Sequence, residues 1–174
     1  MWPRVRPRRG QGLIEFALVS SILLLLLLAV MDLGSLLAGH LAVVNAARDG
    51  ALVAVNASTN SNADCASLAA IKLMTQGRRG LTVTRIVIYS ADSQGNLVSG
   101  ALANVYLNNP GCPNPASPPT PQMNGWLPSA RTPSVLNIGS LGVQIEYTYT
   151  WQTTAIAVGN FSGSDHVVMP LIPG

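Results

Sequence analysis

An uninterrupted apolar run near the N-terminus constrains this chain more than any other feature. The segment Phe16–Met31 carries no charge and includes six consecutive leucines at positions 23–28. As an α-helix the run is about 24 Å long. With its apolar neighbours Leu13, Ile14 and Leu33 it reaches about 30 Å, the thickness of the hydrocarbon core of a membrane. We therefore expect a single transmembrane helix here.

Basic residues are concentrated before this run. Four of the ten Lys and Arg residues lie within the first nine positions. The positive-inside rule then predicts a cytoplasmic N-terminus, with the chain from about Asp32 onward outside the cytoplasm. The sequence pI of about 9.2 therefore reflects a short basic tail without interleaved aromatic residues. Such a tail does not indicate a nucleic-acid partner.

Three interpretations of the apolar run remain open. A cleaved secretory signal peptide needs a small-x-small site soon after the run, and the candidate near 37–39 comes only after the charged Asp32. An uncleaved single-span anchor is the second interpretation. The third is proteolytic processing before the run, and it depends on the residues around Gly10.

Glu15 lies next to the start of the run. An ionised carboxylate inside a membrane-spanning segment costs about 2–3 kcal/mol. If the chain is cut after Gly10, the new amino group of Gln11 lies about one helical turn from Glu15. It could neutralise the carboxylate in its own chain or in a neighbouring subunit, where the pair would set the register of assembly. Alternatively, the Glu15 side chain extends to the lipid headgroups.

The sequence RRGQGLIEFALV at positions 8–19 resembles the processing site of class III (type IVb, Tad/Flp) prepilin-like proteins. These are cut after a glycine and carry Glu at the fifth mature position. Phe16 follows the glutamate, as is common in TadE-like minor pseudopilins, whereas the major Flp pilins usually have Tyr there.

Two further patches are similar to the TadE-like family. The sequence NAARDGA at 45–51, with Arg48 and Asp49, is similar to the A-R-[DE]-G-A patch that follows the hydrophobic helix in that family. The sequence MDLG at 31–34 is similar to the D-F-G exit of the same helix, with Leu in place of Phe. The resemblance covers about residues 8–55.

This resemblance implies a structural subunit, a minor pseudopilin of a Tad/Flp-type pilus or related secretion apparatus in the inner membrane. Gly10 and Gln11 would form the processing site, and Glu15 and Phe16 would act in assembly and register. Its partners would be other pilin or pseudopilin subunits, a prepilin peptidase and membrane lipid. Two alternatives remain, an uncleaved bitopic TadE-like assembly factor and an anchored extracytoplasmic binding or adhesive domain.

The helix is expected to continue beyond the membrane, over residues 11–56, after a basic leader at 1–10. Residues 33–55 contain no proline and are rich in Ala and Leu. Every fourth residue is small over five positions, forming a ridge on which another helix, of this chain or of another subunit, can approach closely. The ridge consists of Gly34, Ala38, Ala42, Ala46 and Gly50. Alternatively, alanine is abundant there simply because it favours helix.

The remaining residues, 57–174, predict an extracytoplasmic α+β domain. Asn62 or Asp64 can cap a short helix that runs through Gln76, before Gly77. Alternating apolar residues predict strands over 81–89 and 141–151, and weaker patterns suggest others within 97–107, near 153–158 and at 166–169. Residues 110–133 hold eight of the twelve prolines and predict an irregular loop. A long helix, a short helix and a small antiparallel sheet make up a pilin-like layout.

The two cysteines, Cys65 and Cys112, would lie outside the cytoplasm, where disulfides persist. A bridge would pin the proline-rich loop to the domain and contribute about 3–4 kcal/mol by chain entropy, although two free buried thiols remain the alternative. We expect His40 in the membrane-proximal helix and His166 beside Asp165 in a turn, and neither has a third ligand or nucleophile at a recognisable spacing. The sequence therefore predicts no enzyme, no metal, no cofactor and no small-molecule substrate.

Overall fold

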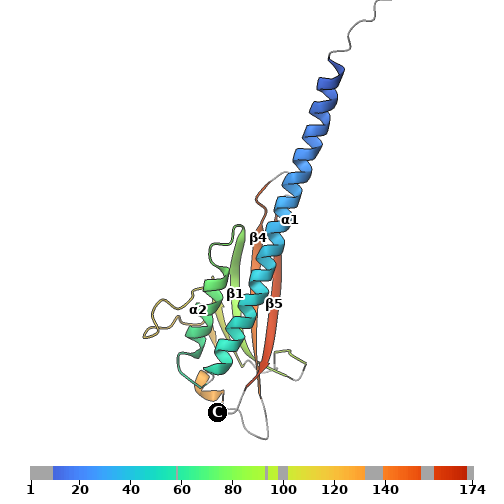
Figure 1. Cartoon of the computed structure of the whole chain (residues 1–174). Helices are drawn as coiled ribbons and strands as arrows, with labels where there is room; N and C mark the ends of the chain where they lie inside the picture. The colour runs from blue at the N-terminus through green and yellow to red at the C-terminus, as the bar shows by residue number, and fades with distance from the viewer. Residues whose placement is uncertain are drawn as a thin grey trace, which may run out of the picture.

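A computed structural model describes residues 10–57, 59–92, 94–97, 102–131, 139–153 and 159–171 of the chain. Its longest element is α1, a 46-residue helix at Gln11–Asn56, which is about 69 Å long. Figure 1 shows the N-terminal part of α1 projecting beyond the rest of the molecule, while its C-terminal part lies along the sheet. The expected long N-terminal helix is therefore present, and only part of it belongs to a folded domain.

The sheet has five antiparallel strands in the order β3-β2-β1-β4-β5. The strands are β1 (Leu81–Ala91), β2 (Ala103–Leu107), β3 (Met123–Asn124), β4 (Ser140–Thr150) and β5 (Asn160–Pro170). With α1 and the short helix α2 (Ala63–Thr75) packed beside it, the sheet completes the α+β layout that the sequence predicts. That fold class is confirmed.

The strands predicted over 81–89 and 141–151 are confirmed as β1 and β4. From Val143 onward β4 alternates as a half-buried strand requires, whereas β1 is buried at four consecutive positions, 86–89. In β4, the alternate residues Val143, Ile145, Tyr147 and Tyr149 are all buried, as expected for one face. β4 pairs with β1 on one side and with β5 on the other. It therefore lies inside the sheet, between β1 and the edge strand β5, and much of the apolar core forms against it.

α2 packs against α1 through a close approach at Gly50. A Cβ added at Gly50 would lie 2.7 Å from Cγ1 of Ile71, and the Ser67 hydroxyl donates a hydrogen bond to the Gly50 carbonyl at 2.9 Å. The helix ends as expected, with Gln76 as C-cap and Gly77 at φ +73°. Its start differs from the expectation, because neither Asn62 nor Asp64 makes a side-chain capping bond there.

β5 differs most from the sequence prediction. It runs over eleven residues and pairs with β4 along its whole length, so Asp165 and His166 lie in a strand and not in a turn. Only 166–169 was expected to be strand, because Ser, Gly and Asp upstream have low strand propensity. Pairing with β4 overrides that local preference. The strand expected near 153–158 falls largely outside the described residues, and Thr153 itself is not in a strand.

The proline-rich segment is more ordered than the irregular loop that the sequence predicts. β3 adds two residues to the edge of β2, with Asn124 opposite Asn104 and Met123 opposite Val105. A short 3₁₀ helix, η1, follows at Pro128–Ala130. The disulfide between Cys65 and Cys112 is present, with 5.2 Å between the two Cα atoms and a sequence separation of 47. It ties the start of the segment to α2.

Candidate functional site

α1 consists of two parts with different surroundings. In the exposed segment, Gln11–Ala38, Asp32 is the one buried residue, whereas the packed segment, Gly39–Asn56, buries one face against the domain. The most apolar stretch of α1 has a mean hydropathy of 2.7, with none of it buried in the chain. α1 is therefore long and apolar enough to cross a membrane, and its apolar surface has no partner among the described residues.

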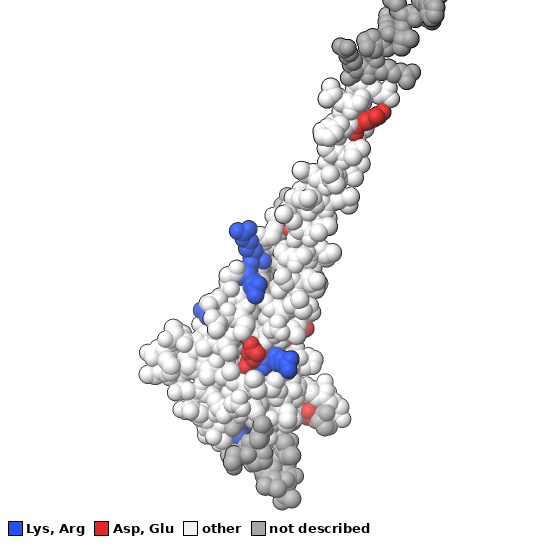
Figure 2. Space-filling view, in the orientation of Figure 1, with Lys and Arg blue, Asp and Glu red and all other residues white. Residues whose placement is uncertain are grey.

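The predicted processing and register residues lie at the free end of the exposed segment. α1 begins at Gln11, directly after Gly10. The Gln11 side-chain amide donates a hydrogen bond to Glu15 Oε1 at 3.0 Å, one turn along the helix. Phe16 is 72% exposed. Figure 2 shows acidic atoms near the free end of the exposed segment, which is otherwise largely uncharged.

The ridge of small residues divides between the two segments of α1. Gly34 has no atom within 4 Å of an added Cβ, and Ala38 is exposed. Ala42, Ala46 and Gly50 are buried in the domain. The packed segment thus uses its small residues inside this chain, whereas the first two positions of the ridge remain uncovered.

Arg48 and Asp49 of the family patch lie on the packed segment without being buried. Arg48 is exposed and Asp49 is half-buried. Among the residues that the structure describes, neither forms an ion pair. They are not brought together with Glu15, which is more than thirty residues earlier on the same helix.

A set of hydrogen bonds joins the exposed segment to the end of β4, and sequence reasoning did not anticipate it. The Asp32 carboxylate is buried and accepts hydrogen bonds from the backbone N–H and the hydroxyl of Thr153. Three residues later, the Ser35 hydroxyl lies 2.5 Å from the Tyr149 hydroxyl. The sequence signal was present in part, because Asp32 is an acidic residue directly after an apolar run. These contacts position α1 where it leaves the domain.

A second polar contact fixes the packed segment on the sheet. His40 Nδ1 lies 3.0 Å from the Tyr147 hydroxyl and 3.2 Å from Asp165 Oδ2. Burial, together with the Asp165 carboxylate, raises the pKa of Tyr147. The three residues come from α1, β4 and β5, so they hold one helix against two neighbouring strands.

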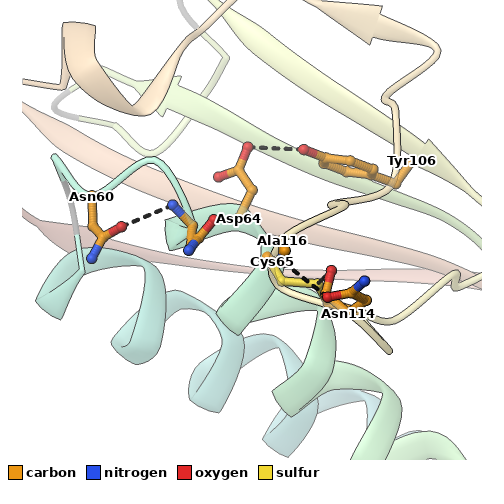
Figure 3. The surroundings of a disulfide bond; sticks show 8 residues. Asn60, Asp64, Cys65, Tyr106, Asn114 and Ala116 are labelled. Carbon is orange, nitrogen blue, oxygen red and sulfur yellow. Dashed lines mark hydrogen bonds between the residues drawn. A yellow bond between two sulfur atoms is a disulfide. The ribbon is translucent and has the colours of Figure 1, made fainter.

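Asp64 organises a buried polar cluster next to the disulfide (Figure 3). Its carboxylate pairs with Arg131 at 2.5 Å and accepts hydrogen bonds from Asn104 at 2.6 Å and Tyr106 at 2.9 Å. Arg131 also lies over the Trp126 ring, 4.6 Å from its centroid. Burial and the neighbouring carboxylate raise the pKa of Tyr106. The cluster secures the end of the proline-rich segment, as the disulfide secures its start.

The polar contacts around Asp32, His40 and Asp64 join elements of the fold to one another. Among the described residues, no three His, Cys, Asp or Glu side chains gather as they would around a metal ion. The Asp64 carboxylate is occupied by Arg131, Asn104 and Tyr106. The surface that stands without partners is instead the exposed segment of α1.

Comparison with known proteins gives one match. Residues 10–52 match the family model of TadE-like proteins. No curated protein and no solved structure matches the chain. The matched residues begin at Gly10, include both segments of α1 and the Arg48–Asp49 patch, and contain no part of the sheet. The resemblance seen in the motifs is therefore confirmed over this N-terminal region, which is similar to TadE-like proteins.

Proposed function

We propose that this chain is a minor pseudopilin of a Tad/Flp-type pilus or related secretion apparatus. A prepilin peptidase removes residues 1–10, and the mature chain assembles with other pilin or pseudopilin subunits through the exposed segment of α1. The chain acts by packing and is itself no enzyme. The match of residues 10–52 to the TadE-like family model supports this context.

The observation that carries the proposal is the unpartnered apolar surface of the exposed segment. Most of its large apolar side chains are more than half exposed; Leu23, for example, is 63% exposed and Leu27 is 54% exposed. Such a surface is stable in lipid, or against similar helices that replace the lipid. The exposed leucines continue after Asp32 at Leu37 and Leu41, which favours a helix partner beyond the membrane as well.

The position of Glu15 supports processing at Gly10. The helix starts at the residue after Gly10, and the Gln11 side chain already reaches Glu15. Cleavage would add a positively charged amine at Gln11, one turn from this carboxylate. The amine can pair with Glu15 of the same chain or of a neighbouring subunit, and the pair removes the cost of a lone charge at the membrane boundary.

The proposed topology follows from the same helix. The N-terminus lies in the cytoplasm, the exposed segment spans the inner membrane, and the α+β domain lies outside. The basic leader supports this orientation by the positive-inside rule. The Cys65–Cys112 disulfide is consistent with an oxidising compartment for the domain.

Cleavage is tested by co-expression of the chain with a prepilin peptidase of a Tad system. Gly10→Leu should leave a precursor about ten residues longer, because a bulky side chain obstructs the peptidase and glycine keeps the bond flexible. Gly12→Leu is the matched control, since Gly12 is also an exposed glycine with open space around it, and it should be cleaved. N-terminal sequencing of the extracted protein should give Gln11 as the first residue.

Assembly is tested separately with Glu15→Gln. This variant should be cleaved normally and should fail to enter the assembled fraction, because the new amine has lost its partner. A wild-type chain that still starts at Met1 or Trp2 beside an active peptidase would overturn the pseudopilin proposal in favour of the uncleaved assembly factor. A cleaved chain whose isolated domain binds a surface without the helix would favour the anchored adhesive domain.

A further inference from the structure

We propose that the domain carries a rim of membrane-facing residues, Arg78, Arg79 and Trp151, which binds the phosphate groups of anionic phospholipids around the point where α1 leaves the bilayer. This inference rests on the membrane insertion of α1 in the proposed function and does not depend on cleavage at Gly10.

The α2–β1 turn, residues 76–80, leads directly into Leu81, which lies against α1 close to the end of its exposed segment. Gly39 of α1 faces Leu81, with 3.9 Å from an added Cβ to the Leu81 side chain. Gly39 is seven residues after Asp32, which corresponds to about 10 Å along the helix. Figure 1 shows the connection between α2 and β1 at the end of the domain from which the exposed segment projects. The turn is therefore placed next to the membrane surface.

The turn is held in a defined conformation. Gly77 and Gly80 have φ values of +73° and +74°, a region that other residues rarely adopt. The Thr150 N–H donates a hydrogen bond to the Gly80 carbonyl at 2.8 Å. A side chain at Gly80 would also collide with Gln152, 2.7 Å from an added Cβ. The two arginines between these glycines thus sit on a turn anchored to β4.

Both arginines have charge available for a ligand outside the domain. Arg78 and Arg79 are exposed. The described residues offer neither of them an ion-pair partner, whereas Arg85 pairs with Glu146 and Arg131 with Asp64. Figure 2 shows basic atoms extending from the domain alongside the largely uncharged exposed segment of α1. Long arginine side chains can direct their guanidinium groups toward a headgroup layer in this position.

Trp151 lies at the same end of the domain, directly after β4. It is half-buried and stacks edge-to-face on Tyr149, with ring centroids 5.7 Å apart and an angle of 85°. Tyr149 in turn contacts Ser35 of the exposed segment. Tryptophan is enriched at membrane–water interfaces, and arginine forks bind phosphate through two hydrogen bonds. The residue types and their common location both fit a headgroup layer.

The nearby carboxylate does not oppose this binding. Asp32 lies in the same region, but its side chain is 2% exposed and accepts hydrogen bonds from Thr153. Each Lys or Arg near an anionic membrane surface shifts its binding equilibrium about fivefold. The two arginines together would therefore hold this end of the domain against the membrane surface and limit the movement of the domain around the point where α1 leaves the bilayer.

The test uses the full chain in nanodiscs of phosphatidylcholine alone or mixed with phosphatidylglycerol. A nitroxide is attached at Gln76→Cys, the exposed first residue of the turn; the two native cysteines are bridged and do not react. We expect the label to become less mobile and more accessible to lipid-soluble oxygen when phosphatidylglycerol is present. Arg78→Gln and Arg79→Gln should each lower this docked population about fivefold, and added salt should lower it as well.

Arg48→Gln is the matched control, because it removes one exposed charge from α1 nine residues beyond Gly39. It should leave the docked population unchanged. The rim proposal is overturned by equal label behaviour in the two lipids, by equal effects of the Arg48 and Arg79 variants, or by immobilisation that depends on protein density in both lipids and so indicates a second copy. A second label at Leu25→Cys reports insertion. If it lies outside the lipid, the proposed topology fails too; if it lies in lipid while the Gln76 label does not respond, only the rim fails.

Discussion

The exposed and packed segments of α1 belong to one continuous helix, yet their side chains differ in size more than in polarity. The exposed segment presents leucines on all sides, including the run at positions 23–28. The packed segment presents Ala42, Ala46 and Gly50 to the domain. Lipid accepts large apolar side chains in every direction, whereas a neighbouring helix or sheet can approach only where side chains are small. The comparison shows that residue size along one helix separates the part that has no partner among the described residues from the part that packs on the domain.

The largest expected difference between the segments follows from a charge placed on the ridge. Ala46→Arg should lower the free energy of unfolding of the domain by more than about 4 kcal/mol, because it forces an unpaired charge into a fully buried site. Ala38→Arg places the same side chain at an exposed position, and the domain should keep its stability within about 0.5 kcal/mol. Chemical denaturation of the full chain in detergent, followed by circular dichroism and limited proteolysis, measures both. Equal destabilisation by the two variants would remove the distinction between the segments.

The second comparison concerns membrane insertion. Leu25→Arg should make the free energy of membrane insertion less favourable by about 2.5–3.5 kcal/mol, the cost of arginine at the centre of a spanning helix. Leu52→Arg is the control, because Leu52 is 49% exposed on the packed segment and should not affect insertion. Resistance of the chain to alkaline extraction from membranes reports the difference. Loss of insertion in the Leu52 variant would show that the packed segment also contacts lipid.

A smaller effect is expected from adding one methyl group at two glycines. Gly50→Ala should destabilise the domain by about 1–3 kcal/mol, because its Cβ would lie 2.7 Å from Ile71, which is fully buried. Gly34→Ala meets open space and should stabilise the helix by about 0.5–1 kcal/mol. The midpoint of thermal unfolding should therefore move in opposite directions. A stabilised Gly50 variant would indicate that α1 and α2 separate easily.

The smallest expected effect is a loss of domain stability at alkaline pH, which has no counterpart in the exposed segment. The pKa values of Tyr106 and Tyr147 are raised by burial and by the carboxylates of Asp64 and Asp165. Since the folded phenols hold their protons more tightly than the unfolded ones, their stabilising contribution is complete below about pH 10 and is lost as the pH rises above it. Tyr147→Phe should reduce this alkaline loss, as measured by denaturation at several pH values. The exposed segment contains no tyrosine, so its helix content should not follow this titration.

The sequence predicted most reliably those elements whose pattern is local. Six consecutive leucines and the alternating residues of β1 and β4 indicate their environment within a few positions, and α1, β1 and β4 appear where they were expected. β5 was predicted only in part, because its first half has low strand propensity and becomes a strand only by pairing with β4. Asp64 was interpreted as a possible helix cap. Its partner Arg131 lies more than sixty residues away in the chain, and no local pattern joins the two.

By itself, the sequence determined that one apolar helix long enough to span a membrane precedes an α+β domain, and its motifs indicated the TadE-like family. These properties depend on the composition of short windows, which determines their transfer to lipid or their strand and helix preference. Only the tertiary structure decided which ridge residues are covered and how the strands are ordered. It also placed the α2–β1 turn and Trp151 at the end of the domain from which the exposed segment of α1 projects. Those outcomes depend on contacts between distant residues, whose partners are chosen by packing and buried hydrogen bonds across the whole domain.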